Sequence, residues 1–105
     1  MELAEYQHIN RAENYIVTQH SRRRMGERGI LLRDVMCVID GGEIIEEYPD
    51  DFPFPSCLVL GPSADGRQLH AVVGMNEEDI FLITAYEPDP DLWEDDLRTR
   101  KERSK

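Results

Sequence analysis

Four apolar side chains recur with a helical period in the first half of the chain. They are spaced i, i+3, i+4 and i+7, and a glycine pair follows them. This spacing predicts a helix that ends at Gly41-Gly42 and buries one face against the rest of the fold. The four predicted core residues are Leu32, Val35, Met36 and Ile39.

Two further helices are predicted before this one. Thr18 is a suitable N-cap, and a helix is expected to run from it to about Arg28 and to stop at Gly29. Its interior contains a single large apolar residue, so most of its surface must be exposed or functional. A second helix is expected within residues 2–12. The short apolar run at 15–17 is expected to be extended or to lead into the Thr18 helix.

The pattern changes to that of strands after Gly42. Proline cannot donate a hydrogen bond to a strand ladder, so the three prolines within residues 49–55 predict a loop. Helices followed by a meander of strands predict an α+β fold, with N-terminal helices packed on a roughly four-stranded antiparallel sheet. The four predicted strands are residues 43–48, 56–61, 68–75 and 80–86.

Alternation along the strands assigns their faces. In the third strand, Leu69, Ala71 and Val73 share one face, so His70 points to the other. The apolar face is expected to pack on the core helix. The residues expected to contact that helix are Leu58, Leu60, Leu69, Val73 and Ile83.

The length of 105 residues fits one domain, with a core at about residues 15–97 and a charged tail at 98–105. A short helix is expected around Trp93. No apolar run reaches the roughly 20 residues of a membrane helix, and the N-terminus lacks the apolar core of a signal peptide. A cytoplasmic protein is therefore expected. Cys37 and Cys57 lack CxxC spacing, which favours two reduced, buried thiols over a disulfide.

The formal net charge of −10 argues against a general nucleic-acid binder. The charge is unevenly distributed, however. Residues 20–33 contain five arginines and one acid, whereas residues 34–66 and 68–97 contain no Lys or Arg. A solvated helix face explains such a cluster, and so does a site for an anionic ligand.

The arginine cluster contains a stripe of candidate functional residues. His20, Arg24 and Arg28 are four residues apart, so they share one side of the predicted helix. Guanidinium groups bind phosphate in bidentate fashion, and a histidine moves protons near neutral pH. The structural alternative is that these residues pair with the many carboxylates of the chain.

The strands contain three more candidates. His70 lies in the third strand, and Thr84 and Tyr86 share a face at the end of the fourth. A buried structural histidine and edge packing are the ordinary explanations, and a phosphate site is the functional one. The histidines and cysteines lack metal-ligand spacing, so no metal and no cofactor is expected.

Longer runs around these residues resemble a known family, an uncharacterised and mainly bacterial one called domain of unknown function 4258. Its opening pattern is His-x-x-x-Arg-Met-x-x-Arg-Gly-Ile, and the similarity covers about residues 15–97. The family is distantly similar to RelE-like toxins and other small ribonucleases. The similar segments are residues 18–30, 42–46, 58–61, 66–73 and 83–88.

This resemblance implies a RelE/barnase-like fold, metal-independent cleavage of RNA through attack by the ribose 2′-OH, and an antitoxin-like protein partner. RelE-like toxins are typically basic, and this chain is not. The family's recurring polar positions fall on His20, Arg24, Arg28, His70, Thr84 and Tyr86.

The leading hypothesis is a metal-independent endoribonuclease of toxin type. His20 and His70 would be the base and the acid, in either order, while Arg24 and Arg28 would stabilise phosphate and Tyr86 would orient it. The alternative is a non-enzymatic binding module on the same fold. It would hold an acidic or apolar partner with the arginine stripe or with the Phe52-Pro53-Phe54 loop. A small-molecule enzyme is a third hypothesis.

Overall fold

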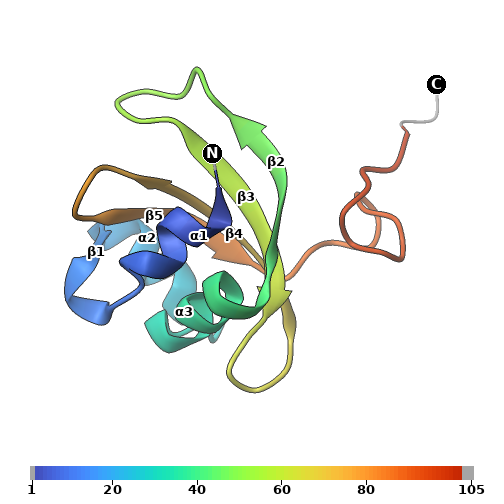
Figure 1. Cartoon of the computed structure of the whole chain (residues 1–105). Helices are drawn as coiled ribbons and strands as arrows, with labels where there is room; N and C mark the ends of the chain where they lie inside the picture. The colour runs from blue at the N-terminus through green and yellow to red at the C-terminus, as the bar shows by residue number, and fades with distance from the viewer. Residues whose placement is uncertain (1, 103–105) are drawn as a thin grey trace.

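The computed structural model describes residues 2–102, and these form helices packed on a five-stranded sheet (Figure 1). The predicted α+β class is confirmed. Met1 and residues 103–105 of the predicted tail lie outside the described residues. The α-helices are α1 (Leu3–His8), α2 (Gln19–Glu27) and α3 (Leu32–Gly41), with a 3-10 turn at Ala12–Asn14. The strands are β1 (Tyr15–Val17), β2 (Glu43–Tyr48), β3 (Ser56–Pro62), β4 (Gln68–Met75) and β5 (Ile80–Tyr86).

The strand order is β1-β5-β4-β3-β2, and strands β2 to β5 form the predicted antiparallel meander. The prediction of a four-stranded, fully antiparallel sheet is wrong, because β1 adds a fifth strand parallel to β5. Tyr15 pairs with Ile80 and Val17 pairs with Leu82. Three residues are too few to show strand alternation, so the sequence left open whether this run is extended.

The two predicted helices after residue 17 are confirmed. Thr18 caps α2, and its Oγ1 accepts a hydrogen bond from the Ser21 N–H at 3.1 Å. Gly29 follows α2 with φ of +66°, a backbone conformation that favours glycine. The helix expected within residues 2–12 is shorter, because α1 spans six residues.

Helix α3 supplies most of the helical residues of the core, and α1 and α2 add Tyr6 and Met25. Val35 and Ile39 are fully buried as predicted, and Val38 is buried beside them. Leu32 and Met36 are half-buried. The helix lies close to β3 because its C-terminal neighbour is Gly42, where a Cβ atom would come within 2.4 Å of the carbonyl oxygens of Val38 and Leu60.

The sheet has two different faces, which we call the inner face, toward α1 and α3, and the outer face, opposite them. Inner-face side chains include Leu69 and Val73, as predicted. The expected contacts of Leu58 and Leu60 with the core helix are wrong. Both side chains belong to the outer face, since their neighbours Cys57 and Val59 point inward.

The expected core position of Ile83 is also wrong, because its side chain is 47% exposed. Val72 pairs with Thr84 but Val73 pairs with Leu82, so Ile83 is an extra residue in a β-bulge. The bulge shifts the alternation of β5 by one residue. Leu82 and Ala85 therefore both face inward, and Thr84 faces outward.

Helix α2 packs along the edge of β5 that the short β1 leaves open. Ser21 of this helix and Arg28, the residue that follows it, donate side-chain hydrogen bonds to strand carbonyls there. Ser21 Oγ donates to the Ile83 oxygen at 2.8 Å, and Arg28 Nη1 donates to the Ala85 oxygen at 2.9 Å. These bonds satisfy edge carbonyls that no strand pairs.

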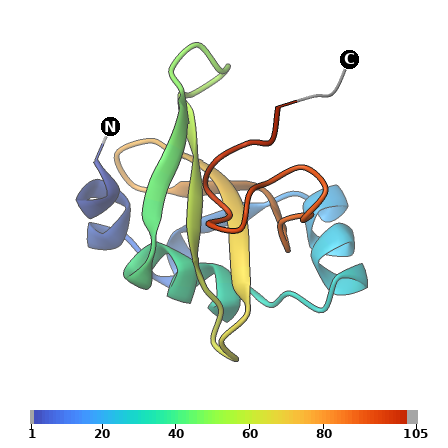
Figure 2. The ribbon, with the colours of Figure 1, turned by 90° about the vertical axis from the view of Figure 1, so that its right-hand side faces the viewer.

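Residues 88–102, which we call the C-terminal strap, cross the outer face of the sheet (Figure 2). Trp93 belongs to the strap and is buried, with 3% of its surface exposed. It forms an isolated β-bridge with Arg100. The short helix expected around Trp93 is wrong, since the chain makes turns there. Within residues 2–102, no helix combines the length and the apolar character that a bilayer-spanning segment requires.

Candidate functional site

His70 is fully buried on the outer face, between the sheet and the strap. Its Nε2 lies 2.6 Å from the carbonyl oxygen of Leu97. Its ring meets the rings of Tyr86 and Trp93 edge-on, with centroids 5.4 and 4.5 Å apart. Its other nitrogen, Nδ1, is buried and has no hydrogen-bond partner within residues 2–102.

The surroundings of His70 determine its protonation state. Burial lowers the pKa of His70, and Arg100 adds to this effect, while the Leu97 carbonyl and the Glu46 carboxylate oppose it. The ring is therefore neutral near pH 7. A carbonyl oxygen only accepts hydrogen bonds, so geometry assigns the proton to Nε2 and leaves the lone pair on Nδ1.

Ion pairs attach the strap to β2. Arg100 donates to the two carboxylate oxygens of Glu46 at 2.7 and 3.0 Å, and Arg98 forms an ion pair with Glu43. The hydrogen bond from Arg100 lowers the pKa of Glu46, whose carboxylate also accepts from the Tyr48 hydroxyl at 2.6 Å. The Arg100 guanidinium also stacks 4.6 Å from the Trp93 ring centroid.

The outer face also holds two of the other candidates. Tyr86 pairs with His70 across β4 and β5, and Thr84 pairs with Val72 two positions along. Arg28, the residue after α2, reaches this face, and its Nη1 donates to the Thr84 Oγ1 at 3.3 Å. Four of the six predicted site residues thus form two contacting pairs, His70 with Tyr86 and Arg28 with Thr84.

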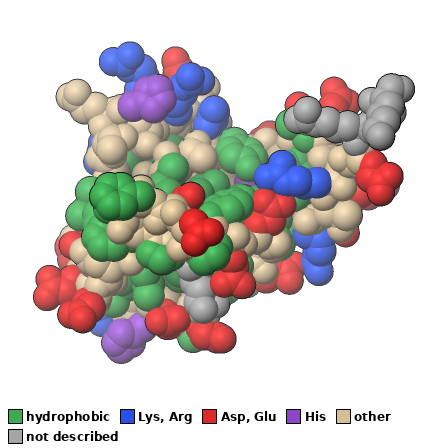
Figure 3. Space-filling model, turned by 90° about the horizontal axis from the view of Figure 1, so that it is seen from above, with side chains coloured by type: hydrophobic (Ala, Val, Ile, Leu, Met, Phe, Trp, Pro, Cys, Tyr) green, Lys and Arg blue, Asp and Glu red, His purple; other side chains and the backbone are tan. Residues whose placement is uncertain are grey.

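The other two candidates, His20 and Arg24, lie on the exposed surface of α2. Within residues 2–102, the side chain of neither residue makes a hydrogen bond, an ion pair or a ring contact with the other candidates. Figure 3 shows Lys and Arg side chains gathered near a histidine at the edge of the molecule where α2 lies. The helix is thus a solvent-facing basic surface beside the outer face.

Sequence reasoning missed the cover of this site. The strap supplies Trp93, Leu97 and Arg100, and β2 supplies Glu46. One signal was available, because Trp93 is the only tryptophan and stands in a segment that is otherwise acidic. A large aromatic residue in such a segment indicates a docking contact.

The candidate residues show no arrangement for a metal. Within residues 2–102, no three His, Cys, Asp or Glu side chains gather where they could hold an ion. Cys37 and Cys57 are free thiols, as expected, but only Cys57 is buried, and Cys37 is half-buried. A cavity of about 670 Å³ between α1 and the end of β4 contains none of the six candidates.

Comparisons with known proteins identify a family and no close relative. No curated protein and no solved structure matches the chain. A family model described as Domain of unknown function (DUF4258) matches residues 17–87, which is most of the chain. The match runs from the last residue of β1 to the residue after β5, so it includes all six candidates and excludes the strap. The chain therefore belongs to this family of proteins with a domain of unknown function.

Proposed function

We propose that the chain is a metal-independent endoribonuclease of toxin type, whose site is the outer face of the sheet once the strap has lifted. The observation that carries the proposal is the Arg28–Thr84 contact at 3.3 Å. It joins the basic helix to the face that holds His70 and Tyr86. An RNA phosphate at this junction would be within reach of both elements.

The proposed reaction is an intramolecular transesterification at one phosphodiester of the RNA. The ribose 2′-oxygen attacks the adjacent phosphorus, the bond to the 5′-oxygen breaks, and a 2′,3′-cyclic phosphate and a 5′-hydroxyl end result. A base takes the 2′-proton and an acid protonates the leaving 5′-oxygen. His20 and His70 would fill these roles, in either order, as RNA spans the β5 edge. Arg24 and Arg28 would stabilise the charge that develops on the phosphate.

The overall charge of −10 makes such a protein an unusual RNA ligand. Positive charge is nevertheless concentrated on one helix. Arg22, Arg23 and Arg24 are all exposed on α2, and Glu27 is the one acid of that helix. An RNA strand on α2 therefore meets local positive charge, which dominates within a Debye length of about 8 Å.

His70 is enclosed when the strap is closed, because Leu97 occupies its Nε2. Its chemistry would therefore require the strap to open. The strap lies outside the family match, so the shared segment of this family ends before the cover begins. Opening would expose Nε2 and would bring the pKa of His70 back toward its ordinary value, since burial is what lowers it.

The experiment compares full-length variants on single-stranded RNA in excess EDTA. We expect Arg100→Ala, which removes a strap anchor, to cleave faster than the wild type and to leave 2′,3′-cyclic phosphate ends. Adding His20→Ala or His70→Ala to that variant should lower the rate by about 100-fold or more. Arg33→Ala is the matched control, because it removes an exposed positive charge outside the stripe.

Absence of cleavage by both the wild type and folded Arg100→Ala protein would overturn the proposal. Circular dichroism would verify that each variant is folded. A cleavage rate that His20→Ala and His70→Ala leave unchanged would overturn the assigned roles instead.

The second candidate function is a non-enzymatic binding module, and the burial of His70 favours it. A histidine with 0% exposure and an occupied Nε2 is an ordinary structural residue if the strap never opens. The exposed arginines of α2 would then hold an acidic partner. This candidate predicts no cleavage by any variant, together with partner binding that Arg24→Ala abolishes.

A further inference from the structure

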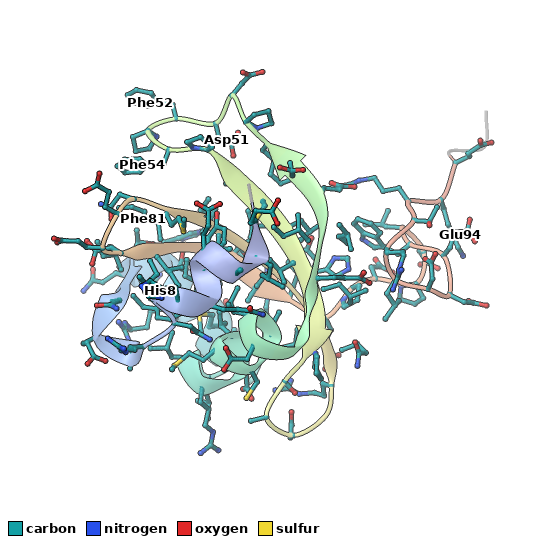
Figure 4. The ribbon with its side chains drawn as sticks, in the orientation of Figure 1. His8, Asp51, Phe52, Phe54, Phe81 and Glu94 are labelled. Atoms are coloured by element: carbon teal, nitrogen blue, oxygen red, sulfur yellow. The ribbon has the colours of Figure 1, made fainter. Side chains whose placement is uncertain are left out.

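The outer face has a second part that the strap leaves uncovered. It is a groove of about 370 Å³ between the β2–β3 loop and the hairpin of β4 and β5. Phe54 stacks on Phe81 at its floor, with ring centroids 4.8 Å apart and planes 13° from parallel. Figure 4 shows Phe52, Phe54 and Phe81 one above another along the same side of the molecule. The lining residues are Asp51, Phe52, Pro53, Phe54, Gly74, Phe81 and Ile83.

Folding alone does not explain these side chains. Phe52 is 95% exposed, so it contributes almost nothing to the core. Ile83, the extra residue of the bulge in β5, is 47% exposed. Clustered exposed apolar side chains mark binding sites, whereas single ones do not. The groove thus gathers apolar side chains that the core does not bury.

The charge of the groove lining is of one sign. The sequence has no Lys or Arg in residues 34–66 or 68–97, which supply the whole lining. Asp51 stands in the groove wall, where the buried hydroxyl of Ser56 donates a hydrogen bond to its carboxylate. Figure 3 shows acidic side chains beside the hydrophobic ones on this face. The acids of the loop and of the β4–β5 turn, all exposed, are Asp50, Asp51, Glu77 and Glu78.

The geometry points to a basic, apolar segment of a partner protein as the occupant of this groove. One aromatic or leucine-sized side chain of that segment inserts against Phe54 and Phe81 beneath Phe52. A neighbouring arginine or lysine lies near Asp51, and an arginine there also stacks on an exposed phenylalanine ring. RNA does not fit, because the acidic rim repels phosphate.

This inference stands independently of RNA cleavage. The groove shares no residue with the His70 site, and the cleavage assay does not depend on Phe52. A folded protein without ribonuclease activity would still bind the segment, and a ribonuclease with an empty groove would still cleave RNA. The two failures are therefore distinguishable.

The test uses full-length protein and fluorescein-labelled ten-residue amidated peptides, with binding measured by fluorescence anisotropy. In the main set, arginines and lysines flank a central Trp, Phe or Leu. One control set replaces the basic residues with glutamate, and another replaces the central residue with glycine. We expect only the main set to bind, with Kd of order 100 µM or below, and high salt to weaken that binding.

Two variants test the location of the bound peptide. Phe52→Ala and Phe54→Ala should each weaken binding at least tenfold. Leu92→Ala is the matched control, because Leu92 is an exposed apolar residue at 56% and lies outside the groove. Phe52 is so exposed that its loss leaves folding intact, which circular dichroism verifies.

Several outcomes would overturn the inference. They are binding that Phe52→Ala leaves unchanged, equal binding of the glutamate or glycine sets, and no binding of any main-set peptide at millimolar concentration. Analytical ultracentrifugation of the chain alone gives a further test. A wild-type dimer that becomes a monomer in Phe52→Ala would overturn the inference, since the occupant would then be a second copy. RNA that binds to the wild type in competition with the peptide, but does not bind to Phe52→Ala, would overturn the inference as well.

Discussion

The two faces of the sheet are both covered, but by contacts of different chemistry. Helices α1 and α3 cover the inner face with hydrophobic side chains, of which Tyr6, Val35 and Ile39 are buried. The strap covers part of the outer face with one tryptophan, one histidine hydrogen bond and two ion pairs. The inner cover therefore depends on apolar area, and the outer cover depends on pH and salt as well.

This difference means that the outer cover can open while the fold persists. Arg98 and Arg100 are more than half exposed, so each ion pair contributes at most about 1 kcal/mol. Burial of Trp93 is the larger part of the docking energy. Segments held by few apolar contacts open at lower free energy than the core does. Trp93 is the only tryptophan, so the tryptophan fluorescence of the chain reports on the surroundings of the strap.

The largest expected effect comes from the inner face. Ile39→Ala should lower the free energy of unfolding by about 2–5 kcal/mol, because it leaves a cavity in a close-packed core. Urea titrations followed by circular dichroism and by Trp93 fluorescence should both shift, since the strap docks on the sheet. Ile16→Ala, at an exposed position, should change stability by less than about 0.5 kcal/mol. Equal effects of the two variants would contradict the assignment of the core.

A smaller, local effect is expected from the strap. Arg100→Ala removes the hydrogen bonds to Glu46 and the contact with the Trp93 ring. Trp93 fluorescence should shift to the red as the ring becomes hydrated, while the unfolding midpoint by circular dichroism moves little. Arg22→Ala removes the same charge on α2 and should leave Trp93 unchanged. A parallel loss of helix signal and Trp93 signal would show that the strap and the core form one cooperative unit.

The stability of the closed strap should depend on pH, whereas the packing of the inner face should not. Burial lowers the pKa of His70, so the closed strap favours the neutral ring and is most stable above the ordinary histidine pKa of about 6.5. That stabilisation is lost progressively as the pH falls below about 6.5. The pKa of Glu46 is also lowered, so its contribution is lost only at more acidic pH. Circular dichroism should stay constant while Trp93 fluorescence changes.

His70→Gln tests the origin of that change. Glutamine keeps an N–H donor for the Leu97 carbonyl but does not titrate in this range. The change in Trp93 fluorescence just below pH 6.5 should disappear, and the one due to Glu46 should remain. A fluorescence titration that is the same in both proteins would assign the pH dependence to another group.

The sequence predicted the fold where its patterns were long enough. The spacing of Val35 and Ile39 predicted α3, and alternation placed His70 opposite Leu69. The sequence left the pairing of β1 open, because three residues are too few to show the alternation of side chains that marks a strand. It also could not show the bulge at Ile83, since a bulge depends on the pairing partner and not on local composition.

The candidate site was predictable only in part. Similarity to the family and helix spacing identified Arg28 and Thr84, which the fold brings into contact. The cover over His70 was not predictable, because it depends on a long-range return of the chain from residue 88 onward. The positive φ of 59° at Leu97, which helps direct its carbonyl, is at a residue that gives no such signal in the sequence.

The smallest expected effect tests where the two faces meet, at the β5 edge. Arg28→Met keeps an apolar stem of similar length but loses the hydrogen bonds to Thr84 Oγ1 and the Ala85 oxygen. Arg28 is exposed, so water replaces the donor, and the loss should be below about 1 kcal/mol. Amide hydrogen exchange should become faster near residues 84–86. It should not become faster in α3, which covers the inner face. The matched variant Arg23→Met, on the same helix, should leave exchange unchanged. Faster exchange throughout α3 in Arg28→Met would mean that the edge contact stabilises the core itself, and the two covers would then not be independent.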